Sequence, residues 1–369
     1  MSWRPGKRVW GALVALLVGG LFLSPTACYL SRGAWEEGKI LARRQPIAKL
    51  VADPHTEPLV RRKLSIVLAA RQYAKDSIRL KTDESFTTYS KLDRDTLVLV
   101  LSAAYRDKLE PYTWWFPIVG RVPYKGFFDF DAARRAAKSL YDDGYDVALR
   151  PSAAFSTLGW FNDPVTSTAL ASDTLDLANT VIHELTHTTF YAPGQAVFNE
   201  SFANFVGARG AAAFFRSRGQ PEAAAMVDAG WEDEKLLGDF WQRLSNSLDS
   251  AYAEHPDSKE ARIRARDTVY REARRILVSD IAPRLRTISP VYAQRVPLDN
   301  ASLLARRIYA KDLDLFDKVW QREGNDLRRT IARVIALAKS DRKDPYAALR
   351  RWLQVAPEGG PPARPRSVP

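Results

Sequence analysis

The chain has 369 residues, of which 46% are hydrophobic and 27% are charged, so it can form one large domain or two modest ones. This composition excludes a chain that is disordered along its whole length. The formal net charge is +12, but the arginines are scattered among acids in helical stretches and no nucleic-acid-binding motif is visible. We therefore expect no nucleic-acid partner, and attraction to anionic lipid or wall polymer fits the basic excess equally well.

The beginning of the chain has the order of charges and apolar residues that is typical of a signal peptide. Basic residues at positions 4, 7 and 8 precede an apolar run at residues 9–23, which has signal-peptide length and is short for a membrane span. Small residues then lead to Cys28, the single cysteine, so neither an intramolecular disulfide nor a thiolate metal cage can form. We predict a signal peptide at residues 1–27, with an uncleaved N-terminal anchor as the alternative.

The first half of the remaining chain changes from helical to strand-like patterns. Apolar residues recur at helical spacing through residues 35–104, and residues 112–128 then combine aromatic β-formers with Pro and Gly, which indicates short strands and loops. A helix is predicted at residues 131–142, a strand at 145–150 and a second strand at 156–161.

From residue 172 onward the pattern is almost wholly helical. The predicted breaks lie at Pro193-Gly194, around Pro256, at Pro290 and at Pro297. Residues 356–369 are rich in Pro, Gly and Arg and are predicted to be a disordered tail. The expected fold is α+β and predominantly α-helical, with one domain at residues 28–355 whose small β-structure lies beside a metal-binding helix pair.

Two histidines mark the segment that carries chemistry. Ser172 and Asp173 are candidate helix N-caps, and Leu175, Ala178, Ile182 and Leu185 then recur at helical spacing as a predicted buried stripe. Residues 181–187, with the sequence Val-Ile-His-Glu-Leu-Thr-His, therefore lie on a helix.

On that helix His183 and His187 are four residues apart, so both imidazoles leave the same face toward a common point. Glu184 projects beside the pair, where it can accept a proton from the attacking water rather than bind the ion. A catalytic zinc site keeps three protein ligands and one open position. Glu200, which lies at the start of the next predicted helix, is free to face back as the third ligand, so we predict one Zn²⁺ per chain.

Several segments resemble known families. A glutamate in the helix that begins Asn199-Glu200-Ser201-Phe202-Ala203 resembles the gluzincin arrangement, in which such a helix completes a two-histidine site. Residues 24–28 resemble the lipobox of bacterial lipoproteins. Together with residues 38–47, 156–164 and 183–187, these segments resemble those of a bacterial lipoprotein family described as predicted aminopeptidases. The resemblance covers roughly residues 28 to 340.

The resemblance implies a location as well as a chemistry. It implies that Cys28 is lipidated and becomes the mature N-terminus, which would hold the protein on a membrane surface through its lipid anchor. Tyr29 is not the aspartate associated with inner-membrane retention, so the expected place is the outer membrane, facing the periplasm. The implied activity is that of a zinc aminopeptidase acting on a peptide or protein.

Other residues are candidates for substrate binding and catalysis. Gly159 and Trp160 lie in a predicted strand that could hold a substrate along its edge, or could be part of a plain core strand. Asp163 could bind a substrate ammonium group, or could form a turn before Pro164. Tyr191 and Tyr309 could donate to the oxyanion, or could pack in the core.

Three functions compete at this point. The first is zinc-dependent hydrolysis of a peptide bond with Glu184 as general base. The second is a non-catalytic envelope lipoprotein whose zinc site is structural or vestigial, although closed structural sites usually have four ligands rich in cysteine. The third is a basic wall- or nucleic-acid-binding module, which leaves the histidines unexplained. His55 and His255 lie in apparent loops and are predicted to be surface residues.

Overall fold

The computed structural model describes residues 25–93, 96, 98–116, 120–152, 164–308 and 311–355. The chain forms two compact units. The first unit consists of Met1–Leu68, Glu84–Asp173 and Asp299–Ser302, and the second consists of Ala69–Asp83, Thr174–Leu298 and Leu303–Pro369. Helices dominate the described residues and the sheets are small, which confirms the predicted α+β, predominantly helical fold class.

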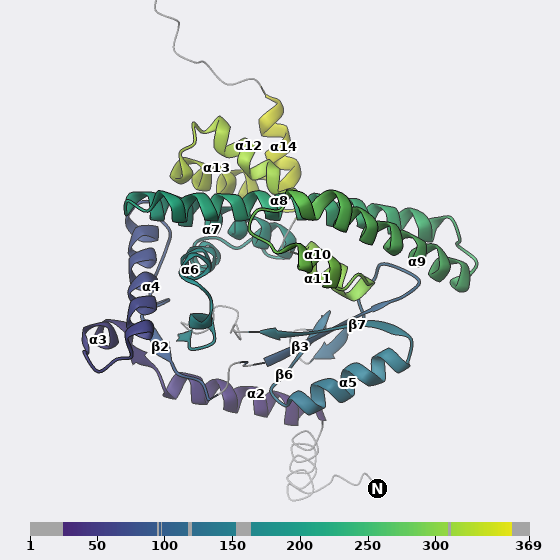
Figure 1. Cartoon of the computed structure of the whole chain (residues 1–369), viewed down its shortest axis with the longest axis horizontal. Coiled ribbons are helices and arrows are strands. Elements are labelled where there is room, and N and C mark those ends of the chain that lie inside the picture. The colour runs from purple at the N-terminus through teal and green to yellow at the C-terminus, as the bar shows by residue number, and fades with distance from the viewer. Residues whose placement is uncertain are drawn as a thin grey trace, which may run out of the picture. The chain divides into compact units, whose positions relative to one another are not determined.

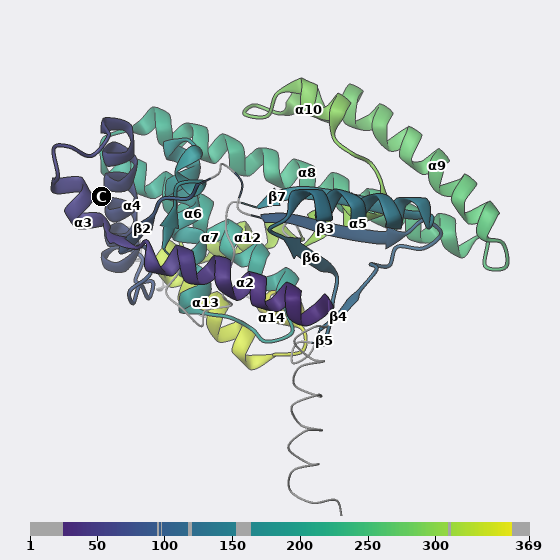
Figure 2. The same ribbon diagram turned by 90° about the horizontal axis from the view of Figure 1, so that it is seen from below.

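The first unit holds the β-structure. Its largest sheet has the order β6-β3-β7 and is antiparallel throughout, and Leu101 of the central strand pairs with Lys125 on one side and Leu149 on the other. Helix α5 packs on this sheet (Figure 2). The described strands are β1 Gln45–Pro46, β2 Thr88–Ser90, β3 Val98–Tyr105, β4 Trp114–Phe116, β5 Gly120–Val122, β6 Tyr124–Phe127, β7 Tyr145–Ser152 and β8 Val165–Thr166.

The helices of the first unit are short, apart from the one at its start. They are α2 Pro25–Ala42, α3 Ile47–Ala52, the first part of α4 Pro58–Asp76, α5 Phe130–Asp142 and the 3-10 helix η1 Ala169–Ala171. Asp129 caps α5, because its carboxylate accepts hydrogen bonds from the backbone N–H groups of residues 131 and 132. The helix predicted at residues 131–142, the strand at 145–150 and the short strands within 112–128 are confirmed. The strand predicted at residues 156–161 lies outside the described residues.

One prediction in this unit is wrong. Residues 98–104 were expected to continue a helical region, but they form β3, the central strand of the sheet. Their sequence, Val-Leu-Val-Leu-Ser-Ala-Ala, is a nearly continuous apolar run. Such a run suits a strand that is covered on both faces, and periodicity alone does not distinguish it from a buried helix.

The second unit is helical (Figure 1). The predicted breaks at Pro193-Gly194, Pro256, Pro290 and Pro297 all fall between helices or at a helix start. Gly219, whose φ of +68° suits a glycine, makes a further break that was not predicted. The described helices of the second unit are α6 Thr174–Thr189, α7 Ala196–Ser217, α8 Pro221–Ala253, α9 Lys259–Ile276, η2 Leu277–Ile281, η3 Ala282–Arg284, α10 Pro290–Arg295, most of α11 Asn300–Arg307, α12 Leu313–Arg322, α13 Leu327–Ser340 and α14 Pro345–Gln354.

None of the helices in the described part of the chain is both long and apolar enough to cross a membrane.

Buried aromatic rings and one buried carboxylate hold α7, α8 and α12 together in the second unit. The rings of Phe202 and Phe205 on α7 both stack on that of Phe316 on α12. The next residue, Asp317, is only 3% exposed, and its carboxylate accepts hydrogen bonds from Arg209 on α7 and from the indole N–H of Trp231 on α8. A buried charge is stable only when it is paired in this way, so Asp317 sets how the three helices face one another.

Helices α6 and α7 approach closely because α7 presents glycine to α6. A Cβ atom on Gly207 would lie 2.3 Å from Oδ1 of Asn179 and 3.2 Å from Cβ of His183. A Cβ atom on Gly210, one turn later, would lie 2.8 Å from Cγ2 of Ile182. Contacts of 2.3 and 2.8 Å are too short for real atoms, so a larger residue at either position must displace the side chains of α6 or move the two helices apart.

We expect Gly207→Ala to destabilise the second unit by about 1–3 kcal/mol, because the added methyl group collides with Asn179 across the interface. Gly230→Ala on α8 is the matched control, since its nearest neighbour would be Oγ1 of Thr287 at 3.8 Å. With that much space the higher helix propensity of Ala should stabilise the protein by about 0.5–1 kcal/mol. Urea unfolding followed by circular dichroism measures both changes, and equal effects of the two substitutions would contradict the close approach.

Candidate metal centre

Two imidazoles and one carboxylate meet in the second unit. Nε2 of His183 lies 3.2 Å from Nε2 of His187. Glu200 faces both rings, with one carboxylate oxygen 3.5 Å from Nε2 of His183 and the other 3.6 Å from Nε2 of His187. Within the described residues, these three side chains form a group whose ligand atoms all lie within 4.8 Å of one another.

Helix α6 places both histidines as the sequence pattern predicts. The helix begins directly after Asp173, and Ala178, Ile182 and Leu185 are buried, while Leu175 is only partly buried. The histidines lie on the neighbouring face and are partly exposed. The buried stripe therefore anchors the helix and leaves the imidazoles open to a ligand on the other side.

Glu200 owes its position to the start of α7. The side chain of Asn199 is buried and clamps the preceding loop, because its Oδ1 accepts a hydrogen bond from the N–H of Ala192 and its Nδ2 donates to the carbonyl of Ala192, both at 2.9 Å. Helix α7 begins at Ala196, so Asn199 lies inside its first turn. The clamp holds the Pro193-Gly194 turn against the helix that carries Glu200.

The charges of the three side chains are coupled. Burial alone would raise the pKa of Glu200, but its hydrogen bonds to His183 and His187 and their positive charges outweigh burial and hold the pKa at about 2. Burial alone would lower the pKa of His183, but the hydrogen bond to Glu200 and the charges of Glu184, Glu200 and Glu234 raise it. The site is thus built to hold positive charge, as a proton or as a metal ion.

The donor set and its spacing fit a zinc ion. Zinc bonds to imidazole nitrogen and carboxylate oxygen are about 2.0–2.1 Å long, so neighbouring ligand atoms of a tetrahedral site lie about 3.3–3.4 Å apart. The three distances of 3.2, 3.5 and 3.6 Å surround that value. They are longer than the 2.7–2.9 Å or so of a strong charged hydrogen bond, which favours a shared metal ion over direct pairing.

The other predicted residues are distributed as follows. The side chain of Glu184 is exposed on α6, next to His183. Tyr191 is 56% exposed, and its ring centroid lies 6.4 Å from that of His187. His55 and His255 are exposed, as predicted. Gly159, Trp160, Asp163 and Tyr309, the disordered tail at 356–369 and residues 1–24 lie outside the described residues, and so does the side chain of Cys28, whose backbone belongs to α2.

Glu234 on α8 was not predicted from the sequence, but its charge is coupled to this site. Its charge and that of His183 are close enough for each to shift the pKa of the other. The sequence contains one signal that could have identified it, which is a charged residue in the middle of an otherwise apolar helical stripe. Val227, Trp231, Gly238 and Trp241 occupy the positions one and two turns away and are all buried.

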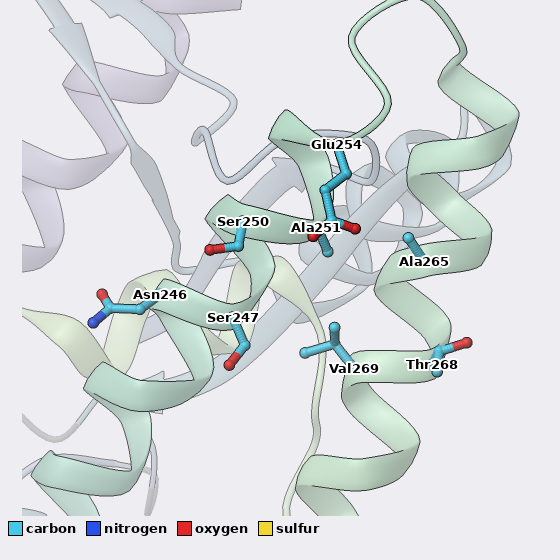
Figure 3. Close-up of a pocket in the computed structure, with 8 residues that line it drawn as sticks. All are labelled: Asn246, Ser247, Ser250, Ala251, Glu254, Ala265, Thr268 and Val269. Carbon is cyan, nitrogen blue, oxygen red and sulfur yellow. The ribbon is translucent and has the colours of Figure 1, made fainter.

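A separate groove of about 590 Å³ lies between α8 and α9. In Figure 3, Ser247 and Ala251 of α8 lie on the side that faces Val269 of α9. The residues that line it are Asn246, Ser247, Ser250, Ala251, Glu254, Ala265, Thr268 and Val269. None of these eight residues belongs to the metal-ligating group, and their single carboxylate offers no comparable set of ligands.

Comparison with known proteins identifies one family. The model of one protein family, described as "Putative aminopeptidase", matches residues 28–349. No curated protein and no solved structure matches the chain. The matched region covers most of the sequence and contains both α6 and α7 with the three candidate ligands. The chain therefore belongs to the family described as "Putative aminopeptidase".

Proposed function

We propose that this protein is a zinc-dependent aminopeptidase of the cell envelope, with His183, His187 and Glu200 holding one zinc ion per chain and Glu184 as the general base. The observation that carries the proposal is the spacing of the three ligand atoms, at 3.2, 3.5 and 3.6 Å. The family supports a peptidase, and two imidazoles with one carboxylate are a ligand set used by catalytic zinc, which leaves a fourth position open.

Zinc, when bound, would act as a Lewis acid on the scissile carbonyl and lower the pKa of the attacking water. Glu184 is suited to accept the proton of that water, because it lies on α6 next to His183 but outside the group of ligand atoms. The same carboxyl group then donates the proton to the leaving amine. Water is thereby divided between the two products: its oxygen and one proton form the new carboxyl group, which then ionises, and its other proton is on the new amine.

Tyr191 is the candidate for stabilising the oxyanion. Its phenol is exposed rather than packed in the core, and its ring lies edge-on to that of His187. A hydroxyl group beside the ligands can donate a hydrogen bond that strengthens as negative charge develops on the carbonyl oxygen. Tyr309 is the other candidate that the sequence offers for this role.

A non-catalytic protein with a vestigial zinc site is the alternative, and Glu184 argues against it. Within the described residues, no hydrogen bond or ion pair involves the Glu184 carboxylate, and the side chain is exposed. A structural site needs the three ligands but has no need of a carboxylate held free beside them. A free carboxylate in this position is what proton transfer requires.

We expect Glu184→Gln to keep stoichiometric zinc and to lower kcat about a thousandfold, because only the proton acceptor is removed. Glu200→Gln should instead weaken zinc binding, and excess zinc should restore part of its activity. Metal analysis after dialysis and hydrolysis of a peptide library test both variants. Full zinc in the Glu200→Gln protein would remove Glu200 from the ligand set, and full activity of Glu184→Gln would refute the mechanism.

Zinc affinity should decrease as the pH is lowered, because zinc binds only the neutral imidazole. The pKa of His183 is raised above 6.5 in the metal-free protein, so the ring carries a proton below that raised value and loses it as the pH rises. Zinc binding near neutral pH should therefore release protons, and the Kd should increase about tenfold for each pH unit below the raised pKa. Calorimetry in buffers of different ionisation enthalpy measures the protons released. A Kd that stays constant from about pH 8 to about pH 5 is incompatible with this site.

The envelope location rests on Cys28. The residues before it resemble a lipobox, and a thioether-linked diacylglyceryl group with a further acyl chain would anchor the protein stably. Cys28→Ser should abolish labelling by radioactive palmitate and leave the precursor at its full length. Because the chain has no other cysteine, palmitate incorporation that persists in this variant would show that the anchor is not at Cys28.

A further inference from the structure

Helix α2 packs on the first unit through one face. A Cβ atom on Gly33 would lie 3.7 Å from the ring of Phe128. Ile40, two turns later on the same face, is 5% exposed and packs with Phe128 and Val98. The hydroxyl of Ser90 donates a hydrogen bond of 2.6 Å to the carbonyl of Ile40. These contacts hold α2 in one rotation about its axis, so its opposite face is directed away from the sheet.

That opposite face carries an exposed tryptophan. Trp35 is 68% exposed, the largest value among the large hydrophobic side chains that the structure describes. It lies two residues after Gly33, which is about 200° around the helix, and therefore on the side opposite the packed face. In both views the strands β3 and β6 lie on one side of α2 (Figures 1 and 2). Among the described residues, none makes a hydrogen bond or a ring contact with the indole.

The surface around Trp35 is low and nearly neutral. The exposed residues next to it on this face are small and uncharged, and they are Ser31, Gly38 and Ala42. We call these three residues and Trp35 the outer face of α2. At its edge the charge of Lys39 is paired with that of Glu36. The outer face of α2 thus offers an accessible indole without a cluster of unpaired charges around it.

A bilayer surface is the partner that the outer face of α2 fits. Tryptophan is enriched at the boundary between lipid headgroups and hydrocarbon, because its ring is apolar and its N–H can donate a hydrogen bond. A protein partner would need more surface, since a stable interface buries about 800 Å² on each side. One indole supplies at most about 250 Å² of that area, and its three neighbours are small.

The proposed lipid anchor determines where the bilayer lies relative to α2. Position 28 is two turns, or about 10 Å, before Trp35 on the same side of the helix. The headgroup layer on each side of a bilayer is only about 5–8 Å thick, because the hydrocarbon core takes about 30 Å of a total of about 40–45 Å. An upright α2 would hold the indole outside this layer, whereas an α2 that lies flat holds both positions within it.

We propose that the outer face of α2 lies flat on the membrane surface, with the indole of Trp35 among the lipid headgroups. This inference rests on the proposed anchor at Cys28 and adds the orientation of the anchored protein. A lipid chain alone is a single tether about which the protein can rotate. The indole is a second attachment on the same side of the helix, so one side of the first unit is held against the bilayer.

Lipid-borne quenchers test the inference without depending on activity. The full chain with Gly38→Cys is purified in its lipidated form, labelled with nitrobenzoxadiazole and reconstituted in vesicles of phosphatidylethanolamine and phosphatidylglycerol. A Cβ atom at position 38 meets no atom within 4 Å, and the new thiol is the only free one because the lipid occupies Cys28. Lipids with a nitroxide in the headgroup should quench this label strongly. The same label in Met226→Cys, which replaces an exposed residue of the second unit, should stay unquenched. Equal quenching at both positions would overturn the inference.

The contribution of the indole is measured by adding Trp35→Ala to the labelled Gly38→Cys protein. The ratio of docked to undocked protein should decrease about tenfold, because a large apolar side chain no longer leaves water on docking. The matched control is Trp115→Ala, which removes an indole that is 65% exposed on β4. It should leave the ratio unchanged. Quenching that persists fully without Trp35, or equal losses in the two variants, would refute the role of the outer face of α2.

Two further comparisons identify the partner. An increase from about 0.05 M to about 0.5 M salt should leave the quenching unchanged, whereas its loss would show that docking depends on exposed charges and not on the indole. Shielding of the label by peptidoglycan but not by vesicles would assign the face to wall polymer and overturn the inference. If the protein carries no lipid and stays in solution, the proposed anchor fails first. An anchored protein whose residue 38 is not quenched keeps the anchor and refutes only the docking of α2.

Discussion

The close approach of α6 and α7 is the constraint on which the candidate site depends. Imidazole and carboxylate side chains have limited reach, so three ligand atoms can gather within 4.8 Å only if the two helices that carry them are nearly in backbone contact. Gly207 and Gly210 make this possible, because no side chain separates them from Asn179 and Ile182 on α6. Glu200 lies seven residues before Gly207 on the same face of α7, so the glycine contact also directs its carboxylate toward the histidines.

The packing of α6 on α7 puts the Glu200 carboxylate in a partly buried position. The two neighbouring imidazoles stabilise its charge there. Glu200 stays ionised with a pKa of about 2 because the two imidazoles favour its charged form more than burial opposes it. The imidazole of His183 in turn is surrounded by the carboxylates of Glu184, Glu200 and Glu234, which raise its pKa. An excess of negative charge around two imidazole nitrogens would suit a divalent cation.

One buried carboxylate links three helices of the second unit. Asp317 receives hydrogen bonds from Arg209, Trp231 and Lys235, so a single buried carboxylate links α7, α8 and α12. The charge of Glu234, which also lies on α8, acts on His183. Family membership agrees with a peptidase.

Local features of the sequence determined the helix with the histidine pair. Four-residue spacing of His183 and His187, a buried stripe and the turn residues at Pro193-Gly194 act within one or two helical turns, so they can be recognised without knowing what packs against them. Only the tertiary structure decided that residues 98–104 are a strand, because a continuous apolar run is compatible with a buried strand or a buried helix. It alone also identified the partners of Asp317, since one of them, Trp231, is 86 residues away in the chain. Contacts between residues so far apart in the chain leave no periodic pattern in the sequence, and they exist only after the helices have packed.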